Sequence, residues 1–332
     1  MFCGRRRWRP PTGYSPALGH GLCPVTVATW TTAARKGIQV LLEAGQVAVV
    51  TGAAQGLGRA LAAGLIDCGV SVVLADTATE PLQTTAEEFT ARGARVLSVI
   101  TDVSDAVAVD ALASRTLEHF GRVDIVVNNA AITNDGGRPL WQTDPQDWQR
   151  ALGVNVLGVV HGIQAFVPHM VIAGAGHMVN IASLAGLTAT PFAGAYCASK
   201  HAVVVISETL RGELDAIGLP IGVTVACPAL VRTPMTEGLF TLTQADDDVL
   251  AQHLPAHLST DQLRAQLKRM TSAPMEPEVA AECILAAVEA DRLYALTHGD
   301  FEDGVRHRAE GILAALDDRS WSDIMSGATT HE

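Results

Sequence analysis

The sequence lacks any pair of cysteines spaced for metal binding or redox chemistry. It has six cysteines in 332 residues and no Cys-x-x-Cys spacing. Scattered single cysteines favour reduced thiols inside a cell over a disulfide framework or a zinc site. They are Cys3, Cys23, Cys68, Cys197, Cys227 and Cys283. We therefore predict no metal site and a cytoplasmic location.

Positive charge and long apolar runs are also scarce. Asp and Glu number 35 against 23 Lys and Arg, so the net charge is −12, whereas nucleic-acid binding needs a basic face. A spanning helix needs about 20 apolar residues in a row. The most apolar segment, 154–167, is interrupted by Asn155, His161 and Gln164. The sequence thus predicts neither a nucleic-acid partner nor a membrane partner.

Acidic residues are missing from the N-terminus, where none occurs before Glu43. We predict that residues 1–45, which are basic and contain prolines, form a disordered extension. A secretory signal is disfavoured because His20 and Pro24 interrupt the apolar stretch after the arginines. The alternatives are an organelle transit peptide and translation from an upstream start codon.

From Gln46 onward, short apolar strands alternate with helices of about 12 residues, which predicts βαβ units and one parallel sheet covered by helices on both faces. The expected strands are 46–51, 70–76, 94–100, 122–130, 176–183, 221–229 and 292–298, and long helices are expected at 145–172 and 195–217. The fold class is therefore α/β, with a single doubly wound Rossmann-type domain over residues 46–300. Residues 232–275 interrupt the alternation and predict an insertion over one end of the sheet, whose acidic run 245–248 is expected to start a solvated helix. Residues 301–332 are expected to form a C-terminal helix and tail.

The stretch "TGAAQGLG" (51–58) lies between the first strand and the first helix and contains Gly52, Gly56 and Gly58. Glycine suits a sharp turn and lets a ligand approach the backbone. The following helix N-terminus offers unpaired N–H groups and a positive dipole end to a pyrophosphate. Because the loop follows a strand and precedes a helix, it predicts a dinucleotide site.

Asp76 ends the second strand, about 20 residues after the glycine loop, where an acid can accept hydrogen bonds from the adenosine ribose hydroxyls. It would also repel a 2′-phosphate, and neither Gln55 nor Thr77 brings a compensating positive charge. The sequence therefore favours NAD over NADP as the cofactor.

Five motifs in order resemble the ordinary branch of the short-chain dehydrogenase/reductase family, from residue 46 to about residue 298. They are the loop Thr51–Gly58, Asp102 on the adenine side, Asn128-Asn129-Ala130-Ala131 after the fourth strand, Asn155 in a helix, and Ser183 followed by Tyr196 and Lys200. The resemblance implies the strand order 3-2-1-4-5-6-7. It also implies an enzyme acting on CH–OH groups and a homodimer or homotetramer built through the two long helices.

The resemblance assigns roles to residues. It implies a catalytic set of Ser183, Tyr196, Lys200 and Asn155. It implies a cofactor site formed by Gly52, Gln55, Gly56, Leu57, Gly58, Asp76, Asp102, Val103, Asn129, Ala130, Ala131, Tyr196, Lys200, Pro228, Val231 and Thr233. In this assignment Tyr196 is the general acid or base, since the Lys200 ammonium one turn away stabilises its phenolate. Ser183 would hold the substrate oxygen, and Asn155 would support a water that links Lys200 to solvent.

Two positions depart from the family pattern. Ala131 and Ala229 stand where glycine is usual, and alanine fits there if φ is negative.

The substrate is expected to be a hydrophobic secondary alcohol or its ketone, since the residues expected to surround it are apolar. They are Leu184, Leu187, Pro191, Phe192, Met235, Leu239, Phe240 and Leu250. The alternatives are an NADPH-dependent 3-oxoacyl or ketone reductase and a non-catalytic, NAD-sensing protein on the same scaffold.

Overall fold

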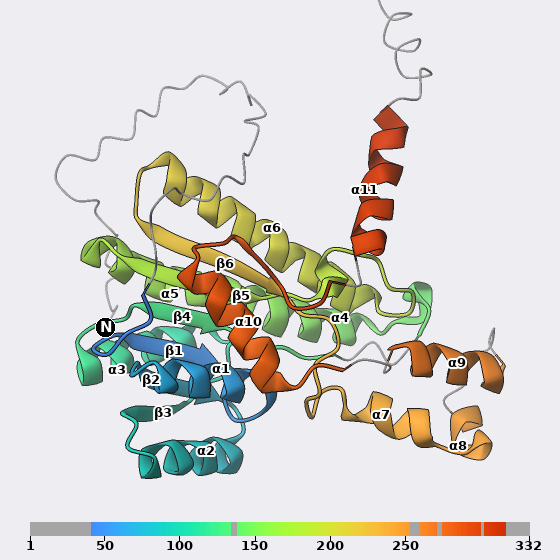
Figure 1. The fold of residues 1–332 in the computed structure, drawn as a ribbon, viewed down its shortest axis with the longest axis horizontal. Helices are drawn as coiled ribbons and strands as arrows, with labels where there is room; N and C mark the ends of the chain where they lie inside the picture. Colours follow the sequence, from blue (N-terminus) through green and yellow to red (C-terminus); the bar gives the residue numbers. More distant parts are fainter. Residues whose placement is uncertain (1–40, 134–137, 253–258, 271–273, 300–301, 317–332) are drawn as a thin grey trace, which may run out of the picture. The chain divides into compact units, whose positions relative to one another are not determined.

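Seven parallel strands form one sheet in the order β3-β2-β1-β4-β5-β6-β7 (Figure 1). The computed structural model describes residues 41–133, 138–252, 259–270, 274–299 and 302–316. The strands are β1 (Val47–Thr51), β2 (Ser71–Asp76), β3 (Val96–Ile100), β4 (Ile125–Asn128), β5 (Gly176–Ile181), β6 (Ile221–Cys227) and β7 (Tyr294–Leu296). The predicted fold class and strand order are confirmed. Residues 1–40 of the predicted extension lie outside the described residues.

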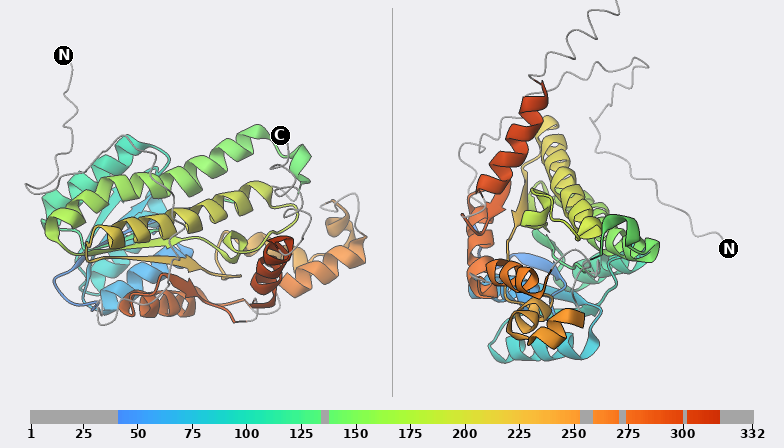
Figure 2. Two further views of the ribbon diagram at one scale, coloured as in Figure 1. Left: turned by 90° about the horizontal axis from the view of Figure 1, so that it is seen from above. Right: turned by 90° about the vertical axis from the view of Figure 1, so that its right-hand side faces the viewer.

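Helices cover both faces of the sheet (Figure 2). One face carries α1 (Gly56–Asp67), α2 (Thr79–Ala91) and α10 (Pro277–Glu289), and the other carries α3 (Ala106–Phe120), α5 (Gly158–Ala173) and α6 (Gly194–Ala216). Successive strand residues point to opposite faces, so Val50 packs under the first set of helices and Val49 under the second. Both valines are fully buried, which explains why the strands read as continuous apolar runs.

The first long helix has three parts in an unbroken run: α4 (Pro145–Ala151), η2 (Leu152–Leu157) and α5. Asp144 starts it by accepting a hydrogen bond from the Gln146 amide, and Pro145 occupies the first helical position. The middle part, η2, is a π-helix around Asn155. By length and composition the run Pro145–Ala173 could cross a membrane, but core helices pass the same test, so this is weak support for a span.

The insertion contains α7 (Glu237–Gln244), α8 (Asp247–Gln252) and α9 (Thr260–Met270). It leaves and rejoins the domain through a parallel bridge between Val231 and Met275. The acidic run does begin a helix, since the Asp246 carboxylate accepts a bond from the Val249 amide. After β7 the chain continues into α11 (Glu302–Leu316).

Candidate active site

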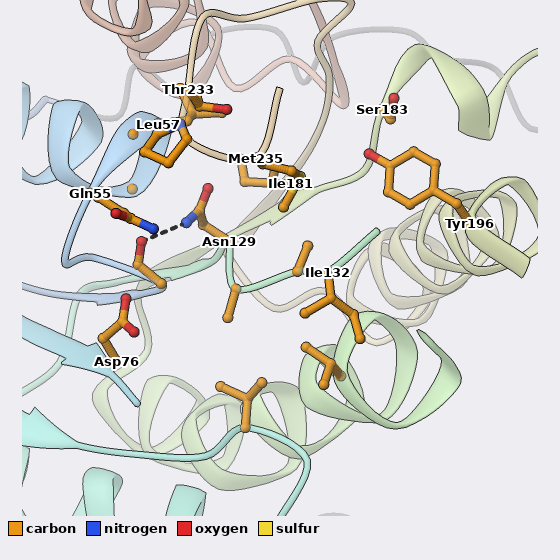
Figure 3. A pocket seen from close by; sticks show the side chains of 18 of the residues that line it. Gln55, Leu57, Asp76, Asn129, Ile132, Ile181, Ser183, Tyr196, Thr233 and Met235 are labelled. Atoms are coloured by element: carbon orange, nitrogen blue, oxygen red, sulfur yellow. Dashed lines mark hydrogen bonds between the residues drawn. The ribbon is translucent and has the colours of Figure 1, made fainter. Parts of the chain in front are cut away.

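A cavity of about 730 Å³ opens at the carboxyl ends of the central strands (Figure 3). This is the edge at which doubly wound sheets bind ligands. Every residue that the sequence assigned to the cofactor lines it: Gly52, Gln55, Gly56, Leu57, Gly58, Asp76, Asp102, Val103, Asn129, Ala130, Ala131, Tyr196, Lys200, Pro228, Val231 and Thr233. Ser183 lines the same cavity.

The glycine loop needs glycine for two separate reasons. Gly52 and Gly56 adopt φ of 64° and 56°, in the left-handed region that favours glycine. A Cβ on Gly58 would lie 2.1 Å from the Gly52 carbonyl oxygen, so only a hydrogen fits there. No side chain caps the start of α1. Its N–H groups are therefore open to a bound anion at the edge of the cavity.

The Asp76 carboxylate is held in place by the backbone around it. One oxygen accepts a hydrogen bond from the Ala54 amide and the other from the Ala78 amide, each at 3.0 Å. Each oxygen keeps a lone pair for a further donor. Of the residues lining this cavity, Arg150 and Lys200 carry the positive charges.

Asp102 organises the neighbouring wall of the cavity. Its Oδ1 accepts bonds from the Ser104 amide at 2.9 Å and the Ser104 hydroxyl at 2.7 Å. The carbonyl of Val103 is bonded to Nδ1 of His161 at 2.9 Å. The turn that contains Asp102 and Val103 is thereby tied to α5, and these two residues form a fixed surface beside the cavity.

The Asn129 side chain joins the end of β4 to the end of β1. Its Nδ2 donates to the carbonyls of Thr51 at 2.8 Å and Gly52 at 3.1 Å, while its backbone amide donates to Thr51 Oγ1 at 3.0 Å. These bonds turn the chain out of the sheet after Asn128, so β4 is shorter than the predicted strand 122–130.

Ser183 and Tyr196 lie at the other end of the cavity from the glycine loop (Figure 3), and Lys200 lines the same cavity beside Tyr196. The Ser183 oxygen accepts from the Ala185 amide at 3.1 Å. Lys200 Nζ lies 5.7 Å from the centre of the Tyr196 ring and donates to the Ile181 carbonyl at 2.9 Å. Burial lowers the pKa of Lys200 to about 8, against the opposing effect of the Cys227 thiol group. The lysine can thus hold a positive charge at neutral pH close to the tyrosine.

Comparison with known proteins identifies this arrangement. Residues 46–243 match the family model described as short chain dehydrogenase. The chain belongs to the short-chain dehydrogenase family. It is 35% identical over 271 residues to a 1-deoxy-11-beta-hydroxypentalenate dehydrogenase of Streptomyces avermitilis, covering 79% of this chain and 91% of that one. It is 38% identical over 209 residues to a 2-(R)-hydroxypropyl-CoM dehydrogenase of Xanthobacter autotrophicus, covering 62% and 83%.

A solved structure of the family agrees over the same region. A short chain dehydrogenase/reductase from Burkholderia phymatum, in complex with NAD, is 38% identical with a TM-score of 0.72 and covers 83% of this chain and 96% of that chain. The prediction of an oxidoreductase of this family acting on CH–OH groups is confirmed.

Both departures from the family pattern are compatible with the backbone. Among the described residues other than glycine, positive φ occurs at Phe192 and Asp291. Ala131 and Ala229 therefore lie in ordinary conformations, and both line the cavity.

Asn155 lies behind the cavity wall of this short-chain dehydrogenase and not on it. It is 1% exposed. Its Oδ1 accepts from the Ile132 amide at 2.8 Å, and its Nδ2 donates to the Ile132 carbonyl at 3.0 Å and to Ser199 Oγ at 3.0 Å. Asn155 thus joins the loop after β4 to helix α6, the helix that carries Tyr196.

The expected substrate-facing set needs correction. Of its eight members, Met235 lines the cavity. Phe240 and Leu250 are buried, at 8% and 0% exposure, and Phe240 lies under the Arg232 guanidinium at 4.4 Å. The prediction was wrong for these two: they are buried and do not line the cavity, and the helices that carry them, α7 and α8, pack against α9.

Sequence reasoning missed part of the lining. The residues not assigned to the cavity are Thr101, Ser104, Ile132, Gln149, Arg150, Gly153, Val154, Ile181, Ala182, Pro234 and Thr236. Most of them adjoin an assigned motif, and that adjacency was the available signal. Gln149 and Arg150 are brought in by the helix before Asn155, which no motif marks.

Proposed function

We propose that this chain oxidises a secondary alcohol, or reduces the corresponding ketone, with NAD as cofactor. One observation carries the proposal: the glycine loop and Asp76 lie at one end of a single cavity, and Ser183 and Tyr196 lie at the other, with Lys200 beside Tyr196. A nicotinamide dinucleotide is an elongated molecule, so its adenosine and nicotinamide ends would reach these two groups.

The cavity fits this cofactor. The uncapped start of α1 and the close approach at Gly58 suit a pyrophosphate. Asp76 keeps lone pairs for the ribose hydroxyls, and a 2′-phosphate beside it would meet a negative charge. The Burkholderia relative that contains NAD supports the same choice.

The chemistry follows from the three polar side chains at the second end of the cavity. A bound nicotinamide supplies the hydride transfer. Tyr196 accepts the hydroxyl proton during oxidation, and the Lys200 charge stabilises the phenolate that does so. Ser183 Oγ accepts from the Ala185 amide, and its own hydrogen is directed to the Pro228 carbonyl over a long 3.4 Å, so this hydrogen can turn toward the substrate oxygen instead.

In the proposed mechanism, Asn155 supports Tyr196, Lys200 and Ser183 without lining the cavity itself. Its side chain is engaged by Ile132 and Ser199, but the π-helix around it departs from the regular backbone hydrogen bonding of an α-helix. We propose that this π-helical segment supports a water that links Lys200 to solvent and returns the proton.

The substrate is a small, largely apolar molecule. Ile132, Ile181 and Met235 line the cavity together with Val154, and apolar walls with few polar groups favour such ligands. The names of the two relatives, a hydroxypentalenate and a hydroxypropyl-CoM dehydrogenase, agree with a hydroxyl group on a carbon skeleton.

Assembly as a homodimer or homotetramer is part of the proposal. Ile172 on α5 and Val205 on α6 are 78% and 57% exposed, and a second copy of these helices would cover them. The predicted cytoplasmic location and the expected lack of nucleic-acid and membrane partners remain predictions.

Replacing Tyr196 with phenylalanine tests the mechanism. Tyr196→Phe should lower kcat by a factor of about 10² to 10⁴, the usual contribution of general acid–base catalysis, while NADH binding measured by fluorescence stays intact. Tyr294→Phe is the matched control, because Tyr294 bonds Glu208 on α6 and does not line the cavity. Unchanged turnover in Tyr196→Phe would exclude the mechanism.

A second experiment tests the substrate class and the choice of cofactor. The protein is incubated with each of a panel of secondary alcohols and with either NAD or NADP, and formation of the reduced cofactor is measured by its absorbance. We expect turnover of apolar alcohols with NAD. Activity confined to polyols would contradict the apolar cavity, and equal use of NADP would contradict the role of Asp76.

A further inference from the structure

Ser199, the residue directly before Lys200, is fully buried, and its hydroxyl group both donates and accepts a hydrogen bond. Its hydroxyl donates to the Tyr196 carbonyl at 2.7 Å, and its oxygen accepts from Asn155 Nδ2 at 3.0 Å. One buried hydroxyl therefore connects the first turn of α6 to the π-helical segment η2.

The directions of these bonds are determined by the donors available. The Tyr196 carbonyl can only accept, so the Ser199 hydrogen points to it, and the Ser199 oxygen must accept from the Asn155 amide. The second Nδ2 hydrogen of Asn155 goes to the Ile132 carbonyl, and Oδ1 receives the Ile132 amide. No alternative orientation of the Asn155 amide satisfies all three partners.

We propose that Ser199 is a positioning residue, which keeps the Tyr196 end of α6 in register with Asn155 and with the cavity wall at Ile132. The proposal rests on the proposed function, in which Tyr196 transfers the proton. Without the hydroxyl, the Asn155 amide loses one of its three bonds, and the hydrogen-bonded connection from the Tyr196 carbonyl through Ser199 to η2 is broken. The Tyr196 hydroxyl would then sample positions away from the substrate.

The chain contains a matched control on the same helix. Ser207 is also fully buried; it donates to the Val203 carbonyl at 2.7 Å and accepts from Asn180 Nδ2 at 3.0 Å. Ser207→Ala removes the same kinds of hydrogen bond as Ser199→Ala. The difference is the partner of each asparagine: Asn155 bonds Ile132, which lines the cavity, whereas Asn180 on β5 bonds Asn128, which does not.

The experiment compares Ser199→Ala and Ser207→Ala in the full chain, with an alcohol that the wild type oxidises. We expect similar losses in thermal stability. Because small misplacements of reacting groups cost up to about 100-fold, we expect kcat to fall at least about tenfold in Ser199→Ala only, with KM for NAD little changed. The rising limb of its pH–kcat profile should move to higher pH, because Tyr196 is then less well aligned with Lys200.

Hydrogen exchange without cofactor gives a readout independent of turnover. Backbone amides of residues 194–200 should exchange faster in Ser199→Ala than in the wild type or Ser207→Ala. Equal kcat losses in the two variants, a wild-type kcat in folded Ser199→Ala, or unchanged exchange would each overturn the proposal. If the wild type oxidises no alcohol, the proposed function fails, and exchange alone decides whether Ser199 holds this turn.

Discussion

Protonation of His177 should destabilise this protein as the pH falls below neutrality. His177 lies on β5, fully buried. Its Nε2 is 2.8 Å from Thr224 Oγ1, which donates its own hydrogen to the Arg292 carbonyl. Nε2 must therefore carry the proton, and Nδ1 has no hydrogen-bond partner in the part of the chain that the structure describes. A second proton would have to go to Nδ1.

The structure sets the size of this effect. Burial, and then the nearby Arg211 guanidinium, lower the pKa of His177 from 6.5 to about 3. Below its ordinary pKa the unfolded chain binds a proton that the native protein does not, so the free energy of unfolding falls with pH over this window. At about 1.36 kcal/mol per pH unit, acidification to pH ~5 costs about 2 kcal/mol from this residue. The Asp291 carboxylate close by is already held by two bonds from Arg211.

Urea unfolding of the wild type and His177→Gln at pH ~7.5 and pH ~5 measures this difference. The variant starts less stable because packing changes, so the comparison is between the two pH-dependent losses. The wild type should lose about 2 kcal/mol more than His177→Gln. His119→Gln, at an exposed position on α3, should behave like the wild type. Equal losses in wild type and His177→Gln would refute a buried, neutral imidazole.

Three further predictions concern the cavity and the thiols. Gly58→Ala should lower NADH affinity and the melting temperature, because overpacking costs about 1–3 kcal/mol and the new Cβ would lie 2.1 Å from a carbonyl oxygen. Gly238→Ala in helix α7, whose Cβ meets nothing within 4 Å, should lower neither. Asp76→Ser should reduce the preference for NAD over NADP at least about tenfold, or about 1.4 kcal/mol, because it removes the charge that opposes a 2′-phosphate. An unchanged ratio of activity with NAD to activity with NADP would show that other residues determine cofactor selectivity. Alkylation followed by peptide mapping should label Cys68, which is exposed. It should spare Cys227, which is buried and whose pKa is raised by burial to about 12. Rapid labelling of Cys227 would contradict the closed packing of β6.

The order of elements and most of the cavity could be predicted because they depend on local patterns. β-Branched apolar runs form buried strands, and each is followed by a helix that returns the chain to the same edge. The last residue of each strand and the residue after it therefore lie at that edge, which is why Gly52, Asp76 and Asn129 line one cavity. The order and spacing of the motifs along the chain were therefore sufficient to predict these cavity residues.

The packing of distant segments against one another could not be predicted from any local pattern in the sequence. Phe240 and Leu250 were predicted to face a ligand, yet both are buried and neither lines the cavity. Equally, the sequence places Ser199 between Tyr196 and Lys200 and Ser207 further along the same helix, but it does not show which group either hydroxyl meets. Which buried amide each serine meets depends on how α6 packs against η2 and β5.

The sequence by itself determined the chain of βαβ units and the glycine turn, since these follow from residue type and spacing, and its family motifs named the side chains that we propose to react. The tertiary structure decided which polar groups share hydrogen bonds and which are sealed from water. Asn155 with Ser199 and His177 with Thr224 are pairs from segments 44 and 47 residues apart. Their hydrogen-bond geometry and the pKa of His177 depend on burial and short distances that exist only after those segments have packed together.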